Sequence, residues 1–115
     1  GYPAGVIIDQ GSNSNGSYVR WSNGLQVCWY YGMRRVKIAT AYGSLYQDYR
    51  DYIFPVAFSS IPTVSVGPAT WDTGASWGSV RETTLTQVSI RYIDVVSRAW
   101  MEIPVGYIAI GRWEE

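Results

Sequence analysis

The stretch Ser-Tyr-Val-Arg-Trp-Ser-Asn-Gly-Leu-Gln-Val-Cys-Trp-Tyr-Tyr, residues 17–31, decides the fold. Two runs of strand-forming residues, 17–21 and 25–31, flank the tripeptide Ser22-Asn23-Gly24. An Asn-Gly step supplies the positive φ angles that a tight hairpin turn requires. The stretch therefore predicts two antiparallel strands joined by a short turn.

Successive side chains of the second arm fall on opposite faces of its strand. One face carries the odd-numbered residues Leu25, Val27, Trp29 and Tyr31. The other carries the even-numbered residues Gln26, Cys28 and Tyr30. A later run, 105–111, is apolar on both faces, which predicts a central strand covered on both sides. In so small a chain, a partner subunit could supply the second cover.

Short alternating runs rich in Val, Ile, Thr, Tyr and Trp recur between turn-forming residues, as in β-sandwiches and barrels. Further strands are predicted at residues 6–8 (weak), 36–41, 63–66, 85–96 (the longest), 99–103 and 105–113. Tyr52, Phe54, Val56 and Phe58 also alternate with other residues, and Pro55 among them indicates an edge strand or a bulge. Connections are predicted at residues 11–16, 42–51 and 67–79. The predicted fold is all-β, a small antiparallel β-sandwich of about six strands plus an N-terminal hairpin.

The length of 115 residues fits one domain. The chain starts at Gly1 rather than Met, and its first part is loop-like. We therefore expect residues 1–16 to be a linker from a preceding region and residues 17–115 to form the sandwich. No run approaches the ~20 apolar residues of a membrane span, and no signal peptide is visible.

The charges balance, with nine Lys and Arg against nine Asp and Glu. Binding to nucleic acid or to an anionic membrane surface requires an excess of basic residues, so neither is an expected partner. A low net charge favours association instead, because little self-repulsion opposes it.

Catalytic chemistry has few candidates, because the chain has no histidine and one cysteine. Cys28 is expected to be a small buried side chain, and Lys37 to be solvated. The carboxylates that a glycosidase would need show no pairing by spacing: Asp72, Glu82, Asp94 and Glu102. Zinc is excluded by its ligand requirements, and a single Ca²⁺ held by scattered oxygens stays open. We expect no enzyme, no cofactor and no metal site.

Recognition remains as the expected task. Tyr and Trp offer rigid faces with a polar handle, and they lose little conformational entropy on contact. Sugars present C–H faces that stack on such rings. Trp71, Asp72, Trp77 and Arg81 place suitable residue types in one predicted loop and the strand that follows it. Strand aromatics such as Trp29, Trp100 and Tyr107 are expected in the core or in a subunit contact.

Two parts of the sequence resemble known families. Residues 11–20, Gly-Ser-Asn-Ser-Asn-Gly-Ser-Tyr-Val-Arg, followed by 24–29, Gly-Leu-Gln-Val-Cys-Trp, look like a segment near the C-termini of phage tail fibre proteins. Residues 54–64, Phe-Pro-Val-Ala-Phe-Ser-Ser-Ile-Pro-Thr-Val, continue as those proteins do. This stretch and the closing Tyr-Ile-Ala-Ile-Gly, 107–111, are also similar to the H-type lectin domain.

The resemblance implies a trimeric sandwich, because H-type lectins are six-stranded trimers that bind sugars such as N-acetylgalactosamine. It places Arg81 near the family's sugar-binding arginine, and Tyr92 to Asp94 near its Trp-His pair. The missing histidine means that this part of the lectin site is not reproduced. The predicted ligand-binding residues are Trp71, Asp72, Trp77, Arg81, Tyr92 and Asp94.

The sequence thus predicts a homotrimeric receptor-binding tip domain of a phage tail fibre, at the distal end of the virion's fibre and extracellular at the host surface. Its expected partner is a host cell-surface glycan or outer-membrane receptor, bound with avidity from trimerisation. A structural module of the fibre that binds no receptor, a free-standing H-type lectin and an enzyme remain as alternatives.

Overall fold

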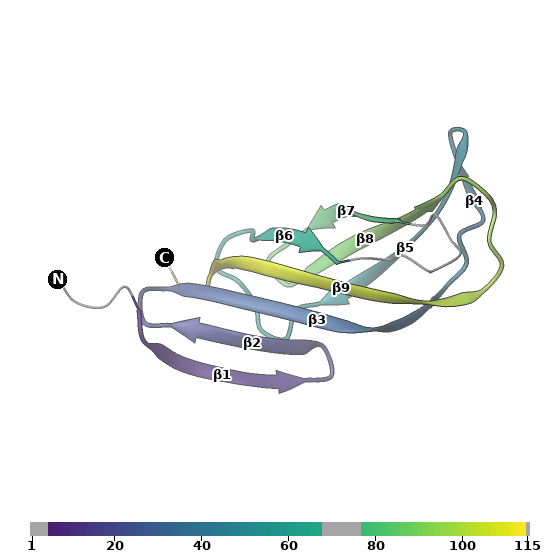
Figure 1. Cartoon of the computed structure of the whole chain (residues 1–115). Coiled ribbons are helices and arrows are strands. Elements are labelled where there is room, and N and C mark those ends of the chain that lie inside the picture. The colour runs from purple at the N-terminus through teal and green to yellow at the C-terminus, as the bar shows by residue number, and fades with distance from the viewer. Residues whose placement is uncertain (1–4, 68–76, 115) are drawn as a thin grey trace.

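A computed structural model describes residues 5–67 and 77–114, and the regular structure among them is entirely β (Figure 1). The strands are β1 Ile7–Asn13, β2 Gly16–Trp21, β3 Leu25–Val36, β4 Thr40–Tyr42, β5 Leu45–Ile53, β6 Thr63–Val66, β7 Trp77–Thr83, β8 Gln87–Asp94 and β9 Met101–Arg112. All of the sheet pairs are antiparallel. The predicted all-β antiparallel sandwich is confirmed.

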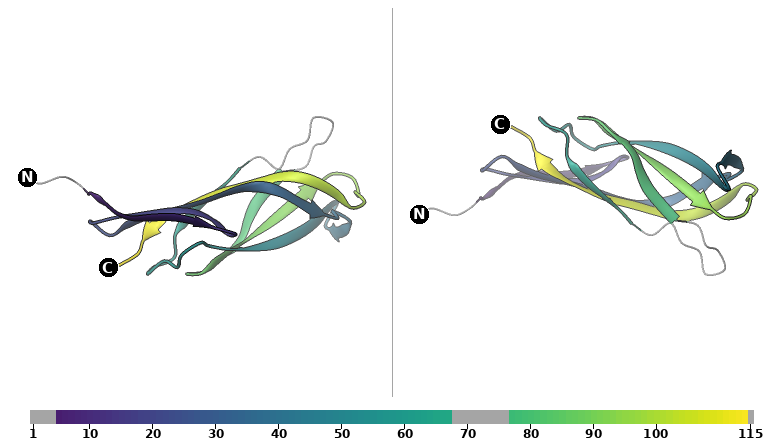
Figure 2. Two further views of the ribbon diagram at one scale, coloured as in Figure 1. Left: turned by 90° about the horizontal axis from the view of Figure 1, so that it is seen from below. Right: turned by 90° about the horizontal axis from the view of Figure 1, so that it is seen from above.

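Two sheets form the layers of the sandwich. The first sheet has the strand order β1-β2-β3-β9-β6, and the second sheet has the order β4-β5-β8-β7. The molecule is elongated, with extents of 54 × 23 × 23 Å. Figure 2 shows the two layers from both sides, with β1 and β2 extending the first sheet away from the second.

The predicted hairpin is present as β2 and β3. Gly24 adopts a φ of +94°, and its N–H donates to the carbonyl of Trp21 at 3.0 Å. β3 continues beyond the predicted end and pairs with β9 from Leu25–Arg112 to Val36–Met101. This long pair forms the backbone of the first sheet. The strand predicted at residues 36–41 is therefore wrong, because Val36 closes β3 and β4 starts only at Thr40.

Two segments expected to be irregular are strands. β1 lies within the predicted N-terminal linker, residues 1–16, and pairs with β2 from Ile7–Trp21 to Asn13–Gly16. β5 occupies the predicted connection 42–51, because it pairs with β8 over eight positions. Its polar and tyrosine-rich composition had suggested a connection. Within the strand, Asp48 and Arg50 form an ion pair at 3.1 Å and so offset each other's charge.

Proline positions caused the remaining boundary errors. The strands predicted at 99–103 and 105–113 are one strand, β9, which contains Pro104. β6 pairs only with residues 107–110, so Pro104 has an open edge where a missing N–H costs no ladder bond. The alternation from Tyr52 is not one strand, because the chain leaves β5 at Phe54, just before Pro55. The predicted strands 63–66 and 85–96 are confirmed, the latter as β8, although β3 and β9 are longer.

The core between the sheets is aromatic. The rings of Phe54 and Phe58 pack edge to face with 5.1 Å between their centres, and the ring centres of Phe54 and Tyr107 are 5.7 Å apart. The hydroxyls of Tyr52 and Tyr92 form a hydrogen bond with each other, and burial raises the pKa of both side chains. The Tyr107 hydroxyl is buried and has no hydrogen-bond partner among the described residues.

Replacement of Gly16 by alanine should destabilise the β1–β2 hairpin. Gly16 has a φ of +134°, and an added Cβ would collide with the carbonyl oxygen of Trp29. The loss should be about 3 kcal/mol in the free energy of unfolding, measured by urea denaturation. Gly43→Ala is the matched control, because Gly43 has a φ of +60° with open space around it and should cost about 1 kcal/mol. Equal losses would contradict the packing at Gly16.

The hydroxyl groups of the core tyrosines should differ in how much they contribute to the free energy of unfolding. Tyr52→Phe leaves the Tyr92 hydroxyl buried without its partner and should cost about 1–3 kcal/mol in the free energy of unfolding. Tyr107→Phe removes a hydroxyl that has no partner among the described residues, and it should be neutral or stabilising. Thermal unfolding of the two variants checks this, and a larger loss for Tyr107→Phe would disprove the assignment.

Candidate functional site

The structure describes four of the six sequence-predicted ligand residues. Trp71 and Asp72 lie outside the described residues. Trp77 begins β7, where its backbone pairs with β8. Arg81 is exposed on the same strand, while Tyr92 and Asp94 lie on β8.

Tyr92 and Asp94 are core residues, so the prediction that they contact a ligand disagrees with their burial. Both are 0% exposed. The Asp94 carboxylate accepts hydrogen bonds from Nε of Arg98 at 2.9 Å and from the N–H of Val96 at 3.1 Å. It therefore fixes the connection that follows β8. Alternation along β8 points both side chains inward, toward the first sheet.

The outer face of the second sheet carries two tyrosine–arginine stacks. The guanidinium carbon of Arg81 lies 4.2 Å from the ring centre of Tyr49, and that of Arg91 lies 4.5 Å from the ring centre of Tyr42. Arg91 also donates to the Tyr42 hydroxyl at 3.1 Å. We call these four residues the tyrosine–arginine face.

Neighbouring strands of the second sheet build this face by reaching across one another. Tyr49 on β5 pairs directly with Arg91 on β8, so the two side chains share a face. Arg81 on β7 crosses β8 to reach Tyr49, and Arg91 crosses β5 to reach Tyr42 on β4. The side chains are therefore positioned by rigid strands as well as by each other. Glu82, 3.9 Å from Arg81, partly balances the charge.

Three polar atoms of β5 and β8 are buried without a hydrogen-bond partner in the described part of the chain: Gln47 Oε1, Ser89 Oγ and Arg91 Nε. All three residues have register positions on the outer side of the sheet. Buried polar groups are normally satisfied by protein or water. This face therefore has hydrogen-bonding capacity that the described residues do not use.

The chemistry of the tyrosine–arginine face suits polar ligands. A guanidinium stacked on a ring keeps N–H groups at its edge for hydroxyl, carboxylate or phosphate oxygens, and Arg91 already uses one of them to donate to the Tyr42 hydroxyl. The rings of Tyr42 and Tyr49 are partly exposed and offer apolar surface beside those donors. Tyr and Arg are the residue types that most often dominate binding energy at interfaces.

The outer face of the first sheet is different, because it is apolar. Its exposed members on β3 and β9 are between 40% and 72% exposed, and they are Trp29, Tyr31, Met33, Ile108 and Ile110. We call these five residues the apolar face. Gly106 leaves a hollow of about 320 Å³ between Trp29, Tyr31 and Ile108. The strand predicted at 105–111 is central, as expected, and its outer side is uncovered by the described residues.

The two faces of β3 differ in burial. The buried side chains are those of Gln26 and Cys28, while the apolar odd-numbered side points outward. Gln26 is satisfied inside, since its Nε2 donates to the carbonyl of Ala57 at 3.0 Å and its Oε1 accepts from Nε of Arg20 at 2.7 Å. The even-numbered side chains of β3 therefore face the core, and its odd-numbered apolar side chains are left on the outer surface.

Tyr42, Tyr49 and Arg91 are the residues that sequence reasoning missed. Tyr42 and Tyr49 fell in a predicted connection, and Arg91 was not among the predicted ligand residues. The period-two pattern of residues 45–53 was the available signal, with Tyr49 between Gln47 and Asp51 on the outer side of β5.

Reactive groups are sparse in the described part of the chain. It contains no group of three or more Cys, Asp or Glu side chains that could hold a metal ion, and no helix long and apolar enough to cross a membrane. Burial raises the pKa of the Cys28 thiol to about 11, so the thiol is protonated near neutral pH. The absence of enzymatic activity stays a prediction.

No known protein-family profile matches the sequence, and no curated protein matches it. Solved structures do match the fold. A C-terminal part of the P. aeruginosa R1 pyocin fibre is 17% identical, with a TM-score of 0.63 over 90% of this chain. An N-truncated R1-type pyocin tail fibre is 15% identical, with a TM-score of 0.57 over 90%. An N-truncated R2-type pyocin tail fibre is 15% identical, with a TM-score of 0.61 over 93%.

The chain spans only part of most of these proteins. It covers 28% of the first R1 structure and 39% of the R2 structure, but 86% of the N-truncated R1-type structure. At such low identity the likeness establishes a shared fold. The described sandwich is folded like a segment of pyocin tail fibres.

Proposed function

We propose that this chain is a receptor-binding module of a phage or phage-tail-like fibre and that it recognises a glycan on the host surface. The likeness of its fold to pyocin tail fibres supports the fibre context. The observation that carries the recognition role is the tyrosine–arginine face, which presents two stacked pairs on rigid strands.

A glycan fits this face better than an apolar ligand does. Sugar C–H groups stack on the rings of Tyr42 and Tyr49, and sugar hydroxyls accept from the guanidinium edges of Arg81 and Arg91. The resemblance to H-type lectins, which stays a prediction, points to the same ligand class. The predicted ligand contacts of Trp71, Asp72 and Trp77 stay predictions.

The apolar face serves self-association in this proposal, and the occupant is a second and third copy of the chain. Contiguous exposed apolar surface on a soluble protein marks an interaction site. The balanced charge of the chain adds little self-repulsion. A homotrimer then presents three receptor sites to one cell, which raises avidity by a factor of about 10² to 10⁴ over a single weak site.

Binding of the purified domain to a susceptible host strain tests the receptor role. Tyr49→Ala combined with Arg81→Ala should weaken binding at least about thirtyfold, because a binding hot spot contributes about 2 kcal/mol or more. Tyr49→Phe keeps the ring and should retain most of the binding. Arg112→Ala, an exposed arginine on the first sheet, is the control.

The same cell assay can reject the receptor role. A folded, assembled domain that fails to adhere to any susceptible strain would favour the alternative of a structural fibre module. Full binding by the Tyr49→Ala and Arg81→Ala double variant would place the receptor contact elsewhere.

Sedimentation velocity tests the trimer. The unaltered domain should sediment as a trimer, and Ile108→Lys should give monomer, because a charge in the apolar face cannot be buried without a partner. Ile53→Lys is the matched control, since Ile53 is similarly exposed but lies on β5 of the second sheet. A wild-type domain that stays monomeric at high concentration would rule out the assembly.

A further inference from the structure

We propose a second binding site, for an anionic sugar group, at the end of the molecule formed by Arg35, Lys37 and Trp100. It rests on the proposed function, because it adds a charged substituent to the glycan that the module would recognise. The group is a carboxylate or a phosphate carried by a sugar. The site is separate from the tyrosine–arginine face.

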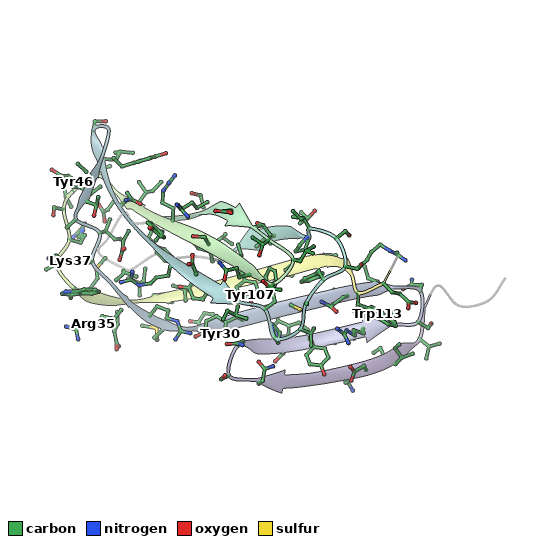
Figure 3. The ribbon with its side chains drawn as sticks, turned by 180° about the vertical axis from the view of Figure 1, so that it is seen from behind. Tyr30, Arg35, Lys37, Tyr46, Tyr107 and Trp113 are labelled. Carbon is green, nitrogen blue, oxygen red and sulfur yellow. The ribbon has the colours of Figure 1, made fainter. Side chains whose placement is uncertain are left out.

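The site lies at the end of the sandwich opposite to the start of β1 and the end of β9. Arg35 is near the end of β3, Lys37 follows it, and Trp100 immediately precedes β9. In Figure 3, Arg35 and Lys37 lie at one end of the molecule and Trp113 lies toward the other. Figure 1 shows the β3–β4 and β8–β9 connections together at that same end.

Trp100 is the centre of this cluster. Its ring is flanked by the guanidinium groups of Arg35, at 5.5 Å from the ring centre, and of Arg50, at 5.7 Å. Trp100 is nevertheless 51% exposed. A tryptophan in the core would not retain so much accessible surface. The Trp100 ring is therefore exposed to solvent, with two guanidinium groups beside it.

The two arginines beside Trp100 differ in whether their side-chain N–H groups are free to bind a ligand. Arg50 is occupied, because it forms an ion pair with Asp48 at 3.1 Å and donates to the carbonyl of Tyr49 at 3.0 Å. Arg35 has no ion pair or side-chain hydrogen bond with the described residues. Its guanidinium lies over the Trp100 ring, and stacking of this kind leaves the N–H edge free.

Lys37 adds a second available cation. Its side chain is exposed and has no ion pair within the described part of the chain. Its backbone is held, since the N–H of Lys37 donates to Asp48 at 3.0 Å. A fixed guanidinium and a mobile ammonium two residues apart can bind one anionic group from two directions.

Acidic residues near this site limit the charge without cancelling it. Arg34, Arg35 and Lys37 place three of the nine cations of the chain within four residues. Asp48 and Asp94 are paired with Arg50 and Arg98. Glu102 pairs in register with Arg35 on β9, but the two side chains form no ion pair. The surplus at this end is therefore positive, although the whole chain is neutral.

Nuclear magnetic resonance titration of the full chain with matched sugars tests the site. The probes are glucuronate, glucose 6-phosphate and glucose, which share a ring and differ in the charged group. Both charged probes should shift the Arg35 and Trp100 side-chain resonances, with dissociation constants in the millimolar range, and glucose should not. Raising the salt should weaken the binding, because exposed charges are screened. A response to one charged probe alone would identify carboxylate or phosphate as the ligand group.

Variants assign the effect to the named residues. Arg35→Ala combined with Lys37→Ala should weaken binding of the charged sugars at least tenfold, while Arg112→Ala should leave it unchanged. Trp100→Ala should abolish the ring-induced shift of Arg35 and weaken binding less than the double variant does. Charged sugars that perturb only the tyrosine–arginine face, or that bind the double variant as tightly as wild type, would overturn the proposal.

The outcome is separable from that of the proposed function. If the domain adheres to host cells but charged sugars do not perturb Arg35, this site is wrong and the receptor role stands. If charged sugars bind at Arg35 but the domain adheres to no cell, the receptor role is wrong. A DNA duplex that displaces the charged sugars from Arg35 as well as an excess of the same sugar does would identify a nonspecific polyanion site. That result would contradict recognition of a sugar.

Discussion

The continuous pairing of β3 with β9 is the constraint on which the rest of the structure depends. The two strands pair over their full lengths, from Leu25–Arg112 to Val36–Met101. One face of this pair forms a wall of the core, where Tyr107, Ile103 and Cys28 are buried. The opposite face carries the apolar side of β3, and it has nothing to pack against among the described residues. The pair thus commits the chain to a sandwich with one unsatisfied apolar side.

The two outer faces of the sandwich consequently have different chemistry. The first sheet presents Trp29, Tyr31 and Ile108, whose burial would be favourable in a subunit contact. The second sheet presents Arg81 and Arg91 stacked on tyrosines, which keep polar edges toward solvent. This separation would let the first sheet form the proposed subunit contact without covering the proposed receptor surface on the second sheet.

Local sequence signals predicted much of the fold. The features that were missed depend on which strands pair with each other, which a single sequence does not show. The Asn23-Gly24 turn, β6 and β8 could be found because turn chemistry and alternation are local. β5 could not, because its polar and tyrosine-rich composition is typical of a connection, and its pairing with β8 is not visible in the local sequence. Tyr92 was selected through the resemblance to H-type lectins, which does not show which side of β8 faces the core. Alternation along β3 likewise separates its two faces without showing which one is buried.

Hydroxyl-radical footprinting of the assembled protein tests the central claim most directly, because it reports which outer face is covered. Trp29, Tyr31 and Met33 should oxidise slowly, although Tyr31 is 72% exposed in the single chain. Tyr42 and Tyr49 should oxidise at the rate of accessible tyrosines and become protected when host-surface glycan is added. Rapid oxidation of Trp29 and Tyr31 together with protection of Tyr42 and Tyr49 in the glycan-free protein would contradict the account.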